Sequence, residues 1–304
     1  MNGPDFFIVG APKCGTTAMT HYLDSHPDIF FPDDKEFHYF GSDIKYEDVF
    51  RNIRDRDEYF SQFEDAGEDQ VVGETSTMNL YSERAAREIH DYDPGSKIII
   101  MLRNPVDMMH SLHRHYLYGG NETIEDFEEA LSAEPERKQG NRLPETMRFR
   151  EGLYYRDVAS YYKQVQSYYD VFERDQISVI VFDDFVNQTD VVYHETLEFL
   201  GVSTDHEPEF ERINPSKQVL SQTLNRFVRK PPAPVEWMVQ LLDQSLPAWM
   251  FRNPVRKLYR LLNTRQDDRD PMDPELRKEL KKEFKPMVKN LESLIHRDLS
   301  NWYE

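Results

Sequence analysis

The stretch from Gly10 to Thr17 has the residue types and spacing of an anion-binding loop. It follows an apolar run at residues 6–9 and reads Gly-Ala-Pro-Lys-Cys-Gly-Thr-Thr. A loop bounded by two glycines can point successive backbone N–H groups inward, and a helix N-terminus behind it favours negative charge. We therefore expect a phosphate-binding loop with a helix beginning near Gly15. A plain strand–turn–helix connection would also fit this spacing.

The position of the lysine in this loop restricts which ligands the loop could bind. Nucleotide triphosphatases have a lysine directly after the second glycine, where it holds the β and γ phosphates. Here Thr16 occupies that position and Lys13 lies inside the loop. The pattern argues against a nucleotide kinase and favours a ligand with a single phosphate at this point. Cys14, the one cysteine, is expected to pack the loop, with a reactive thiol as the alternative.

Further polar residues lie at the ends of other apolar runs. Glu36 and His38 belong to a loop at residues 32–40, Glu74 and Thr75 end the run at 71–75, and Arg103 ends the run at 97–103. The carboxyl ends of parallel strands converge on one ligand-binding region. Arg103, together with Ser111 eight residues later on a predicted helix, could hold a second phosphate. Two phosphate sites suggest a nucleotide with separate 5′ and 3′ phosphates.

Other catalytic arrangements are weaker in this sequence. His110, His113 and His115 do not complete a metal-ligand set, so we expect no metal. Asp183-Asp184 could mimic a magnesium site, but a turn before a helix is the better interpretation. No Ser-His-Asp nucleophile arrangement is evident.

The elements that must position these residues alternate between apolar runs and helical patterns. This alternation predicts an α/β fold: a P-loop-type doubly wound, mainly parallel sheet flanked by helices. The predicted strands are residues 6–9, 28–31, 71–75, 97–103 and 177–182. The predicted helices are residues 16–25, 82–90 with a cap at Ser82, 105–118, 153–172, 190–200 with a stop at Gly201, and 274–296.

We expect one enlarged domain over residues 1–304. Its core would span 5–230, with insertions near 43–66 and 119–150 and a helical C-terminal extension at 231–304. The first insertion is predicted to form short surface helices, and the second is charged and without strong periodicity. Tyrosine pairs recur every seven residues within 153–172, which favours packing against the sheet over a platform for stacking sugars.

The amino-acid composition of the chain restricts which binding partners it could have. The net charge of −19 disfavours nonspecific binding to nucleic acid or anionic membranes. No apolar run approaches the length of a membrane span and no signal peptide is evident, so we expect a cytoplasmic protein. Residues 251–266 contain five Lys and Arg residues and no carboxylate. This basic segment is either a solvated helix face or a dock for an anionic substrate or an acidic carrier protein.

Taken together, these motifs resemble the sulfotransferases that use 3′-phosphoadenosine 5′-phosphosulfate (PAPS), most closely the heparan sulfate and bacterial carbohydrate-type branch. The resemblance covers residues 5 to about 230. It rests on the Phe-Ile-Val-Gly-Ala-Pro-Lys-Cys-Gly-Thr-Thr opening, His26-Pro27-Asp28, Lys35-Glu36-Phe37-His38-Tyr39-Phe40, Gly73-Glu74-Thr75, Leu102-Arg103-Asn104-Pro105 with Ser111, and Arg150-Glu151-Gly152-Leu153-Tyr154.

The resemblance implies PAPS as co-substrate and a role for each matching residue. Lys13, Gly15, Thr16 and Thr17, with Cys14 in the same loop, would bind the 5′-phosphosulfate, and Arg103 and Ser111 the 3′-phosphate. Lys217 corresponds to a late cofactor-binding loop, although the Gly-Arg that accompanies this lysine in heparan 3-O-sulfotransferases is absent here.

Sulfuryl transfer to an alcohol needs a cation at the leaving phosphate and a base for the acceptor proton. Lys13 is the expected cation. Glu36, at the position of the family's catalytic glutamate, is the expected base, and His38 is the substitute. Glu74 and Thr75 could orient the acceptor. We expect a neutral sugar, lipid, small-molecule or carrier-bound hydroxyl acceptor, because the acidic chain fits a polyanion poorly. A nucleotide-binding protein without turnover is the alternative.

Overall fold

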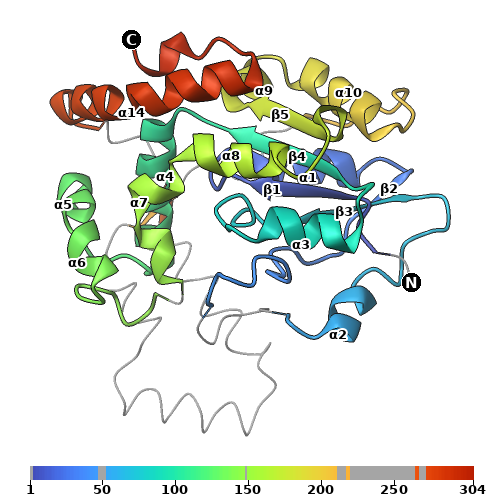
Figure 1. Cartoon of the computed structure of the whole chain (residues 1–304), viewed down its shortest axis with the longest axis horizontal. Coiled ribbons are helices and arrows are strands. Elements are labelled where there is room, and N and C mark those ends of the chain that lie inside the picture. Colours follow the sequence, from blue (N-terminus) through green and yellow to red (C-terminus); the bar gives the residue numbers. More distant parts are fainter. Residues whose placement is uncertain (1–2, 47–52, 148, 211–216, 220–263, 267–271) are drawn as a thin grey trace, which may run out of the picture. The chain divides into compact units, whose positions relative to one another are not determined.

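The computed structural model describes residues 3–46, 53–147, 149–210, 217–219, 264–266 and 272–304 (Figure 1). The chain divides into two compact units. The first, here the sheet unit, comprises Met1–Leu112, Tyr154–Asn214 and Asp273–Glu304. The second unit comprises His113–Leu153 and Pro215–Met272.

A five-stranded parallel sheet forms the centre of the sheet unit. Its strands lie in the order β2-β3-β1-β4-β5. Most of their apolar side chains are almost fully buried, as expected of strands covered on both faces, whereas Phe30, Val71 and Val179 are half-buried. The predicted α/β fold and its parallel sheet are confirmed. The strands are β1 (Phe6–Gly10), β2 (Ile29–Phe30), β3 (Val71–Thr75), β4 (Lys97–Leu102) and β5 (Ile177–Val181).

Helices flank the sheet. Helix α1 contacts α10, whereas α3 contacts α8, which in turn packs against α14 (Figure 1). The helices of this unit are α1 (Thr16–Asp24), α2 (Arg56–Ser61), α3 (Ala85–Tyr92), α7 (Tyr155–Val158), α8 (Tyr161–Tyr169), α9 (Phe182–Asn187), α10 (Thr189–Leu200) and α14 (Pro274–Ile295), with 3₁₀ turns at Arg174–Gln176 and Ser300–Trp302.

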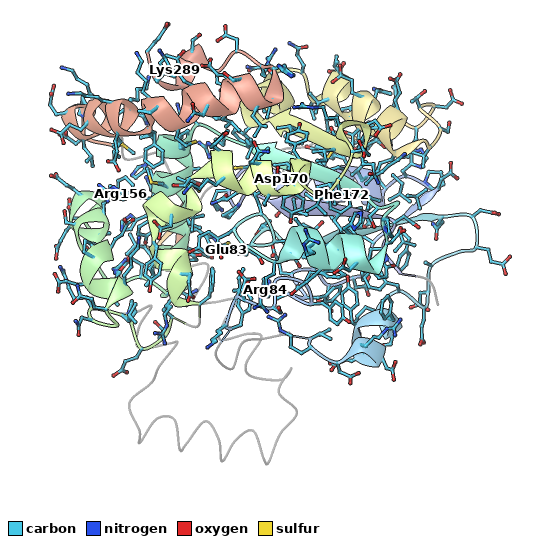
Figure 2. All side chains as sticks on the ribbon, viewed as in Figure 1. Glu83, Arg84, Arg156, Asp170, Phe172 and Lys289 are labelled. Carbon is cyan, nitrogen blue, oxygen red and sulfur yellow. The ribbon has the colours of Figure 1, made fainter. Side chains whose placement is uncertain are left out.

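Local sequence signals set several helix ends. Ser82 Oγ accepts hydrogen bonds from the backbone N–H groups of Arg84 and Ala85. The N-cap residue of α3 is Arg84 rather than the predicted Ser82, and the helix begins at Ala85. Gly201 ends α10 in the left-handed conformation, as predicted. Asp273 caps α14, whose buried apolar residues recur every three or four positions, while charged side chains such as Lys289 are exposed (Figure 2).

The second unit contains more regular structure than its sequence suggested. Helix α4 (Pro105–Gly119) begins in the sheet unit and ends in the second unit. The predicted charged insertion at 119–150 contains α5 (Phe127–Ser132) and α6 (Glu134–Lys138), and it ends at the 3₁₀ turn Arg150–Leu153. A buried ion pair, Arg137 to Glu122 at 2.8 Å, stabilises it. Strands β6 (Lys217–Val219) and β7 (Thr264–Gln266) pair antiparallel, so residues 264–266 are not helical.

Two other local predictions need correction. The predicted helix at 153–172 is broken around Ala159 and Ser160 into α7 and α8, although Tyr161 and Tyr168 pack in the core as expected. Asp183 and Asp184 lie in the first turn of α9 rather than in a turn before a helix. The short surface helix expected within residues 43–66 is present as α2, which is mostly exposed, while Tyr59, Phe60 and Phe63 are buried.

Candidate active site

Two glycines shape the loop that follows β1. Gly10 has φ 144° and Gly15, which caps α1, has φ 92°. A Cβ on Gly10 would lie 2.4 Å from the carbonyl oxygen of Thr77, and one on Gly15 would lie 3.1 Å from the Phe185 ring. Larger residues would therefore clash as well as adopt a strained φ. The chain turns at Gly15 directly into a helix N-terminus, which is the predicted anion-binding geometry.

Three cationic side chains lie around this loop. The Arg103 guanidinium donates to the backbone carbonyl of Lys13 at 3.4 Å and stacks on the Phe182 ring at 4.8 Å. Lys35 Nζ donates to Thr17 Oγ1 at 2.7 Å. Burial and the neighbouring charges of Arg103 and Lys35 lower the pKa of Lys13. These like charges repel one another, so an anion bound between them would be stabilised.

Cys14 contributes packing rather than chemistry. Its side chain is fully buried, and burial raises the pKa of the thiol to about 12. At neutral pH the thiol is therefore protonated and a poor nucleophile. Thr16, at the start of α1, is also buried, whereas Thr17 is partly exposed beside Lys35. Of the two interpretations of Cys14, the structure supports packing.

Residues of the first insertion hold the 32–40 loop in place. Phe37 is buried against the rings of Tyr59 and Phe63. The Arg54 guanidinium donates to the carbonyl oxygens of Tyr39, Gly41 and Ile44. This role was not predictable from the sequence, because spaced aromatic residues in a polar segment give no sign of the loop that they contact.

Glu36 is fixed by Thr77. The Thr77 backbone N–H donates to Glu36 Oε2 at 2.9 Å, and the Thr77 hydroxyl donates to Glu36 Oε1 at 3.0 Å. Burial raises the pKa of Glu36, and these two hydrogen bonds counteract part of the increase. The backbone of Glu36 is left-handed, with φ 62°, and its N–H donates to the Thr75 carbonyl at 2.9 Å. A residue held in this unfavourable conformation by its surroundings is typical of functional sites.

Thr77 was not among the site residues predicted from the sequence. It lies two residues after the end of β3, and only the pairing of this segment with the 32–40 loop brings it to Glu36. The segment 73–77, Gly-Glu-Thr-Ser-Thr, is rich in hydroxyl groups. That composition is the signal that could have drawn attention to it.

His38 lies in a different environment. Its ring stacks on Tyr46 with centroids 4.0 Å apart, and its Nδ1 has no hydrogen-bond partner among the described residues. Burial and the charge of Arg54 lower the pKa of His38 to about 4. At neutral pH the imidazole is uncharged, and with such a low pKa it is a weak base.

Glu74 and Thr75 lie within β3, paired in register with Phe7 and Ile8 of β1. Both are 2% exposed. Thr75 Oγ1 lies 2.9 Å from Thr20 Oγ1 on α1. Ser76 Oγ donates to Glu74 Oε1 at 2.5 Å, while Glu74 Oε2 has no hydrogen-bond partner among the described residues. Burial and, more weakly, the charge of Glu36 raise the pKa of Glu74 to about 8.

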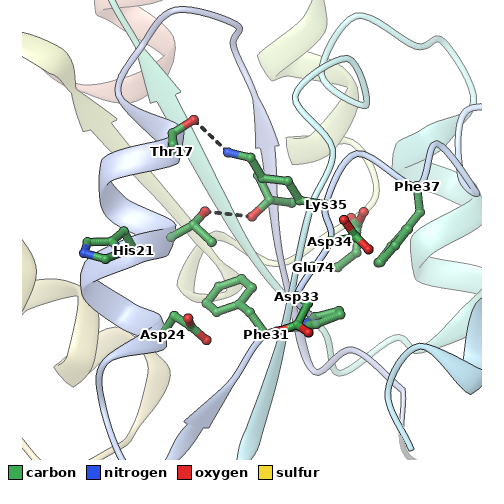
Figure 3. A pocket seen from close by; sticks show the side chains of 12 residues that line it. Thr17, His21, Asp24, Phe31, Asp33, Asp34, Lys35, Phe37 and Glu74 are labelled. Carbon is green, nitrogen blue, oxygen red and sulfur yellow. Dashed lines mark hydrogen bonds between the residues drawn. The ribbon is translucent and has the colours of Figure 1, made fainter. Parts of the chain in front are cut away.

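A pocket of about 220 Å³ lies between α1, the 31–37 segment and β3. Figure 3 shows the Lys35–Thr17 and Thr20–Thr75 contacts that join these elements. The structure therefore brings together the glycine loop, Arg103, the Glu36 loop and the end of β3. The pocket residues are Thr17, Thr20, His21, Asp24, Phe31, Pro32, Asp33, Asp34, Lys35, Phe37, Glu74 and Thr75.

Among the described residues, the structure does not connect Ser111, Lys217 and the basic segment to the site described above. Ser111 lies on α4 within the sheet unit and is partly exposed. Lys217 begins β6 in the second unit, so its predicted role stays a prediction. Residues 251–263 of the basic segment lie outside the described residues.

Within the described part of the chain, no cluster of three His, Cys, Asp or Glu side chains could hold a metal. No helix in that part is long and apolar enough to cross a membrane.

Comparison with known proteins gives consistent matches. The family model described as "Sulfotransferase domain" matches residues 3–219. The crystal structure of a sulfotransferase from Alicyclobacillus acidocaldarius is 33% identical, with a TM-score of 0.74 over the whole of both chains.

Curated relatives include carbohydrate sulfotransferase 15 of Mus musculus, 23% identical over 81% of this chain and 54% of that protein. Heparan sulfate glucosamine 3-O-sulfotransferase 6 of Homo sapiens is 30% identical over 51% of this chain and 38% of that protein. The chain thus spans about half the length, or less, of these curated relatives.

Proposed function

Because the chain belongs to the sulfotransferase domain family, we propose that it transfers a sulfuryl group from PAPS to an acceptor hydroxyl. The observation that carries this proposal is the position of Lys13 and Arg103. Both lie at the glycine loop, and Arg103 donates to the Lys13 carbonyl. The loop thus combines a helix N-terminus with two cations, and it lacks the lysine after Gly15 that a triphosphatase needs. These groups fit a nucleotide carrying two separate phosphates.

In the proposed reaction the acceptor oxygen attacks the sulfur of PAPS in line with the departing 5′-phosphate. The new acceptor O–S bond forms as the bond between sulfur and the bridging phosphate oxygen breaks. Lys13 stabilises the negative charge that develops on that oxygen. Glu36 takes the acceptor hydroxyl proton, and adenosine 3′,5′-bisphosphate leaves with the bonding electron pair.

Glu36 is a better candidate for the base than His38. Thr77 fixes its carboxylate with two hydrogen bonds, which leaves lone pairs for an acceptor hydroxyl. Its raised pKa also brings it closer to a useful value for proton transfer near neutral pH. His38, by contrast, has a pKa lowered to about 4.

Several finer assignments belong to the same proposal. Ser111 would bind the 3′-phosphate with Arg103, and Thr75 would help to orient the acceptor. The family match covers residues 3–219, which include parts of both compact units, and a single sulfotransferase domain over residues 1–304 belongs to the same proposal. Relatives named as carbohydrate sulfotransferases support a sugar acceptor. The cytoplasmic location and the role of the basic segment stay predictions.

A two-part assay tests the proposed function. Adenosine 3′,5′-bisphosphate should raise the melting temperature, and labelled PAPS should transfer sulfate to one class in a panel of hydroxyl acceptors. Stabilisation without transfer to any acceptor would favour a nucleotide-binding protein without turnover. Stabilisation by ATP with magnesium, but not by the bisphosphate, would contradict the proposal.

The Glu36→Gln variant tests the base. It should reduce kcat about 10² to 10⁴-fold with little change in nucleotide affinity, because an amide cannot accept the proton. Glu68→Gln, at an exposed glutamate outside the site, is the matched control. If His38→Ala is the more damaging change, His38 is the base instead.

A further inference from the structure

The first turn of α9 contacts two parts of the proposed nucleotide site. The Arg103 guanidinium lies over the Phe182 ring, 4.8 Å from its centroid. A Cβ added to Gly15 would lie 3.1 Å from the Phe185 ring and 3.2 Å from the Phe182 ring, so the same turn also packs against the glycine loop. The position of this turn therefore affects both the cation and the loop.

The two carboxylates of this turn bind a segment that follows α14, residues 297–302. Arg297 Nη2 donates to Asp184 Oδ1 at 2.8 Å and to Asp184 Oδ2 at 2.7 Å. Asn301 Nδ2 donates to Asp183 Oδ2 at 3.4 Å. The adjacent aspartates, which the sequence did not connect to the site, thus join α9 to the 297–302 segment.

The 297–302 segment also contacts the residue that follows Arg103. Asn104 is 6% exposed, and its Nδ2 donates to the Trp302 carbonyl at 3.3 Å. Asn104 Oδ1 accepts a hydrogen bond from the Val106 N–H at 3.0 Å, so the same side chain also fixes the start of α4. The Trp302 side chain is 1% exposed, which anchors this part of the segment in the core. One segment therefore holds both the backbone beside Arg103 and the turn of α9 on which the guanidinium stacks.

The Arg103 side chain has few contacts of its own that would fix its position. Among the described residues, its guanidinium contacts the Lys13 carbonyl and the Phe182 ring and pairs with no carboxylate. Its charge is therefore available to an anionic ligand. A long side chain loses rotamer entropy when it binds a ligand, and it loses less if its surroundings already hold it in the bound position. The residues that hold Arg103 therefore influence its affinity for a phosphate.

We propose that the 297–302 segment positions Arg103 for the 3′-phosphate of the nucleotide. The proposal rests on the proposed sulfotransferase function, which assigns that nucleotide to the site. Arg297 and Asp184 are positioning residues, because they act through Arg103 and not on the ligand itself. Their ion pair holds the Phe182 ring under the guanidinium, while the rest of the segment holds the backbone beside it.

Calorimetric titration of Arg297→Gln and Asp184→Ala with adenosine 3′,5′-bisphosphate tests the proposal. Both variants break the ion pair, but the first removes a positive charge and the second a negative charge. Loss of positioning should raise the dissociation constant about three- to fivefold in both, the upper part of the range for a partly exposed ion pair. A direct effect of charge on the anionic ligand would instead change the dissociation constant in opposite directions.

The matched control is Glu283→Gln. It breaks another partly exposed ion pair of α14, with Arg156, and should leave the dissociation constant unchanged. Melting temperatures of all three variants should fall by no more than about 4 °C, because partly exposed ion pairs contribute little to stability. Every variant is then folded at the temperature of the titration.

The same two changes in an Arg103→Ala background separate positioning from a general structural effect. If they act through Arg103, they should raise the dissociation constant no further once the guanidinium is absent. A further rise of the same size in that background would overturn the proposal. An unchanged or lower dissociation constant in Arg297→Gln or Asp184→Ala alone would also overturn it.

The outcomes for the wild type distinguish this proposal from the proposed function. Binding of the bisphosphate without sulfate transfer from PAPS to any acceptor would refute the proposed function and leave the positioning role in place. Binding that neither variant weakens would refute the positioning role alone. Failure of the wild type to bind the bisphosphate would refute both.

Discussion

The hydrogen bonds from Thr77 to Glu36 allow a sharp test of how the proposed base is positioned. Thr77→Val removes the hydroxyl that donates to Glu36 Oε1 at 3.0 Å. Valine has nearly the same shape, and the backbone N–H that donates to Oε2 at 2.9 Å remains. The variant therefore removes one of the two hydrogen bonds that fix the Glu36 carboxylate, while the carboxylate itself remains.

The expected size of the effect follows from the kind of hydrogen bond that is lost. A hydrogen bond to a charged group contributes about 1.5–3 kcal/mol, and each 1.4 kcal/mol corresponds to about a tenfold change in rate. If most of this energy keeps Glu36 directed at the acceptor, kcat should fall about 10 to 100-fold. The bound nucleotide makes no predicted contact with Thr77, so the affinity for adenosine 3′,5′-bisphosphate should stay within about twofold.

The pH dependence distinguishes positioning from a general structural effect. Glu36 acts as a base only when it is ionised, so activity should rise with pH through its pKa. The Thr77 hydroxyl lowers that pKa by stabilising the carboxylate. In Thr77→Val the pKa should increase, and the acidic limb of the pH–rate profile should move to higher pH.

The assay is a pH–rate profile with labelled PAPS for the wild type, Thr77→Val and Thr77→Ser. Thr77→Ser keeps the hydroxyl, so it should keep most of the activity, and the acidic limb of its pH–rate profile should lie at the same pH as in the wild type. If Thr77→Val has the kcat of the wild type and its acidic limb lies at the same pH, the hydroxyl does not position Glu36. A serine variant as impaired as the valine variant would show that the methyl group, rather than the hydroxyl, matters.

Three further predictions follow from the site. Lys13→Ala should lower kcat about 10² to 10³-fold in the sulfate-transfer assay, and full activity would exclude its role at the leaving oxygen. Arg103→Ala should chiefly weaken binding of adenosine 3′,5′-bisphosphate, about 10 to 100-fold by calorimetry, through loss of a charge-assisted contact; an unchanged dissociation constant would contradict this. Glu74 has a folded-state pKa of about 8, above its ordinary value, so its contribution to stability is present at pH 4 and is lost as the pH rises toward 8. The melting temperature of Glu74→Gln should therefore fall less than that of the wild type between pH 5 and pH 8, and parallel curves would refute the raised pKa.

Much of the fold could be predicted because its signals are local. The apolar runs at residues 6–9 and 97–103 are long and bounded by polar residues, which fits strands buried on both faces. Pro105 and Gly201 mark helix ends through backbone chemistry that does not depend on the rest of the chain. The glycine spacing and the place of Lys13 also indicated an anion site without any tertiary information.

Sequence patterns did not predict the structure where a segment packs against residues far away in the chain. The polar insertion at residues 43–66 was expected to form short surface helices, and nothing in its sequence indicated that Tyr59 and Phe63 would be fully buried beside Phe37 of the 32–40 loop. The break between α7 and α8 at Ser160 was missed because the tyrosine periodicity continues across it. In both cases packing overrides the local pattern.

The amino-acid sequence by itself determined the sheet strands, the glycine loop and the set of side chains that could bind an anion or take a proton. It could do so because strand burial and glycine conformations are encoded over a few neighbouring residues. Only the tertiary structure decided that Thr77 fixes Glu36, that His38 stacks on Tyr46 with a lowered pKa, and that carboxylates from α1, the 31–37 segment and β3 line one pocket. These relationships join residues far apart in the chain, and they exist only once the parallel sheet brings the ends of its strands together.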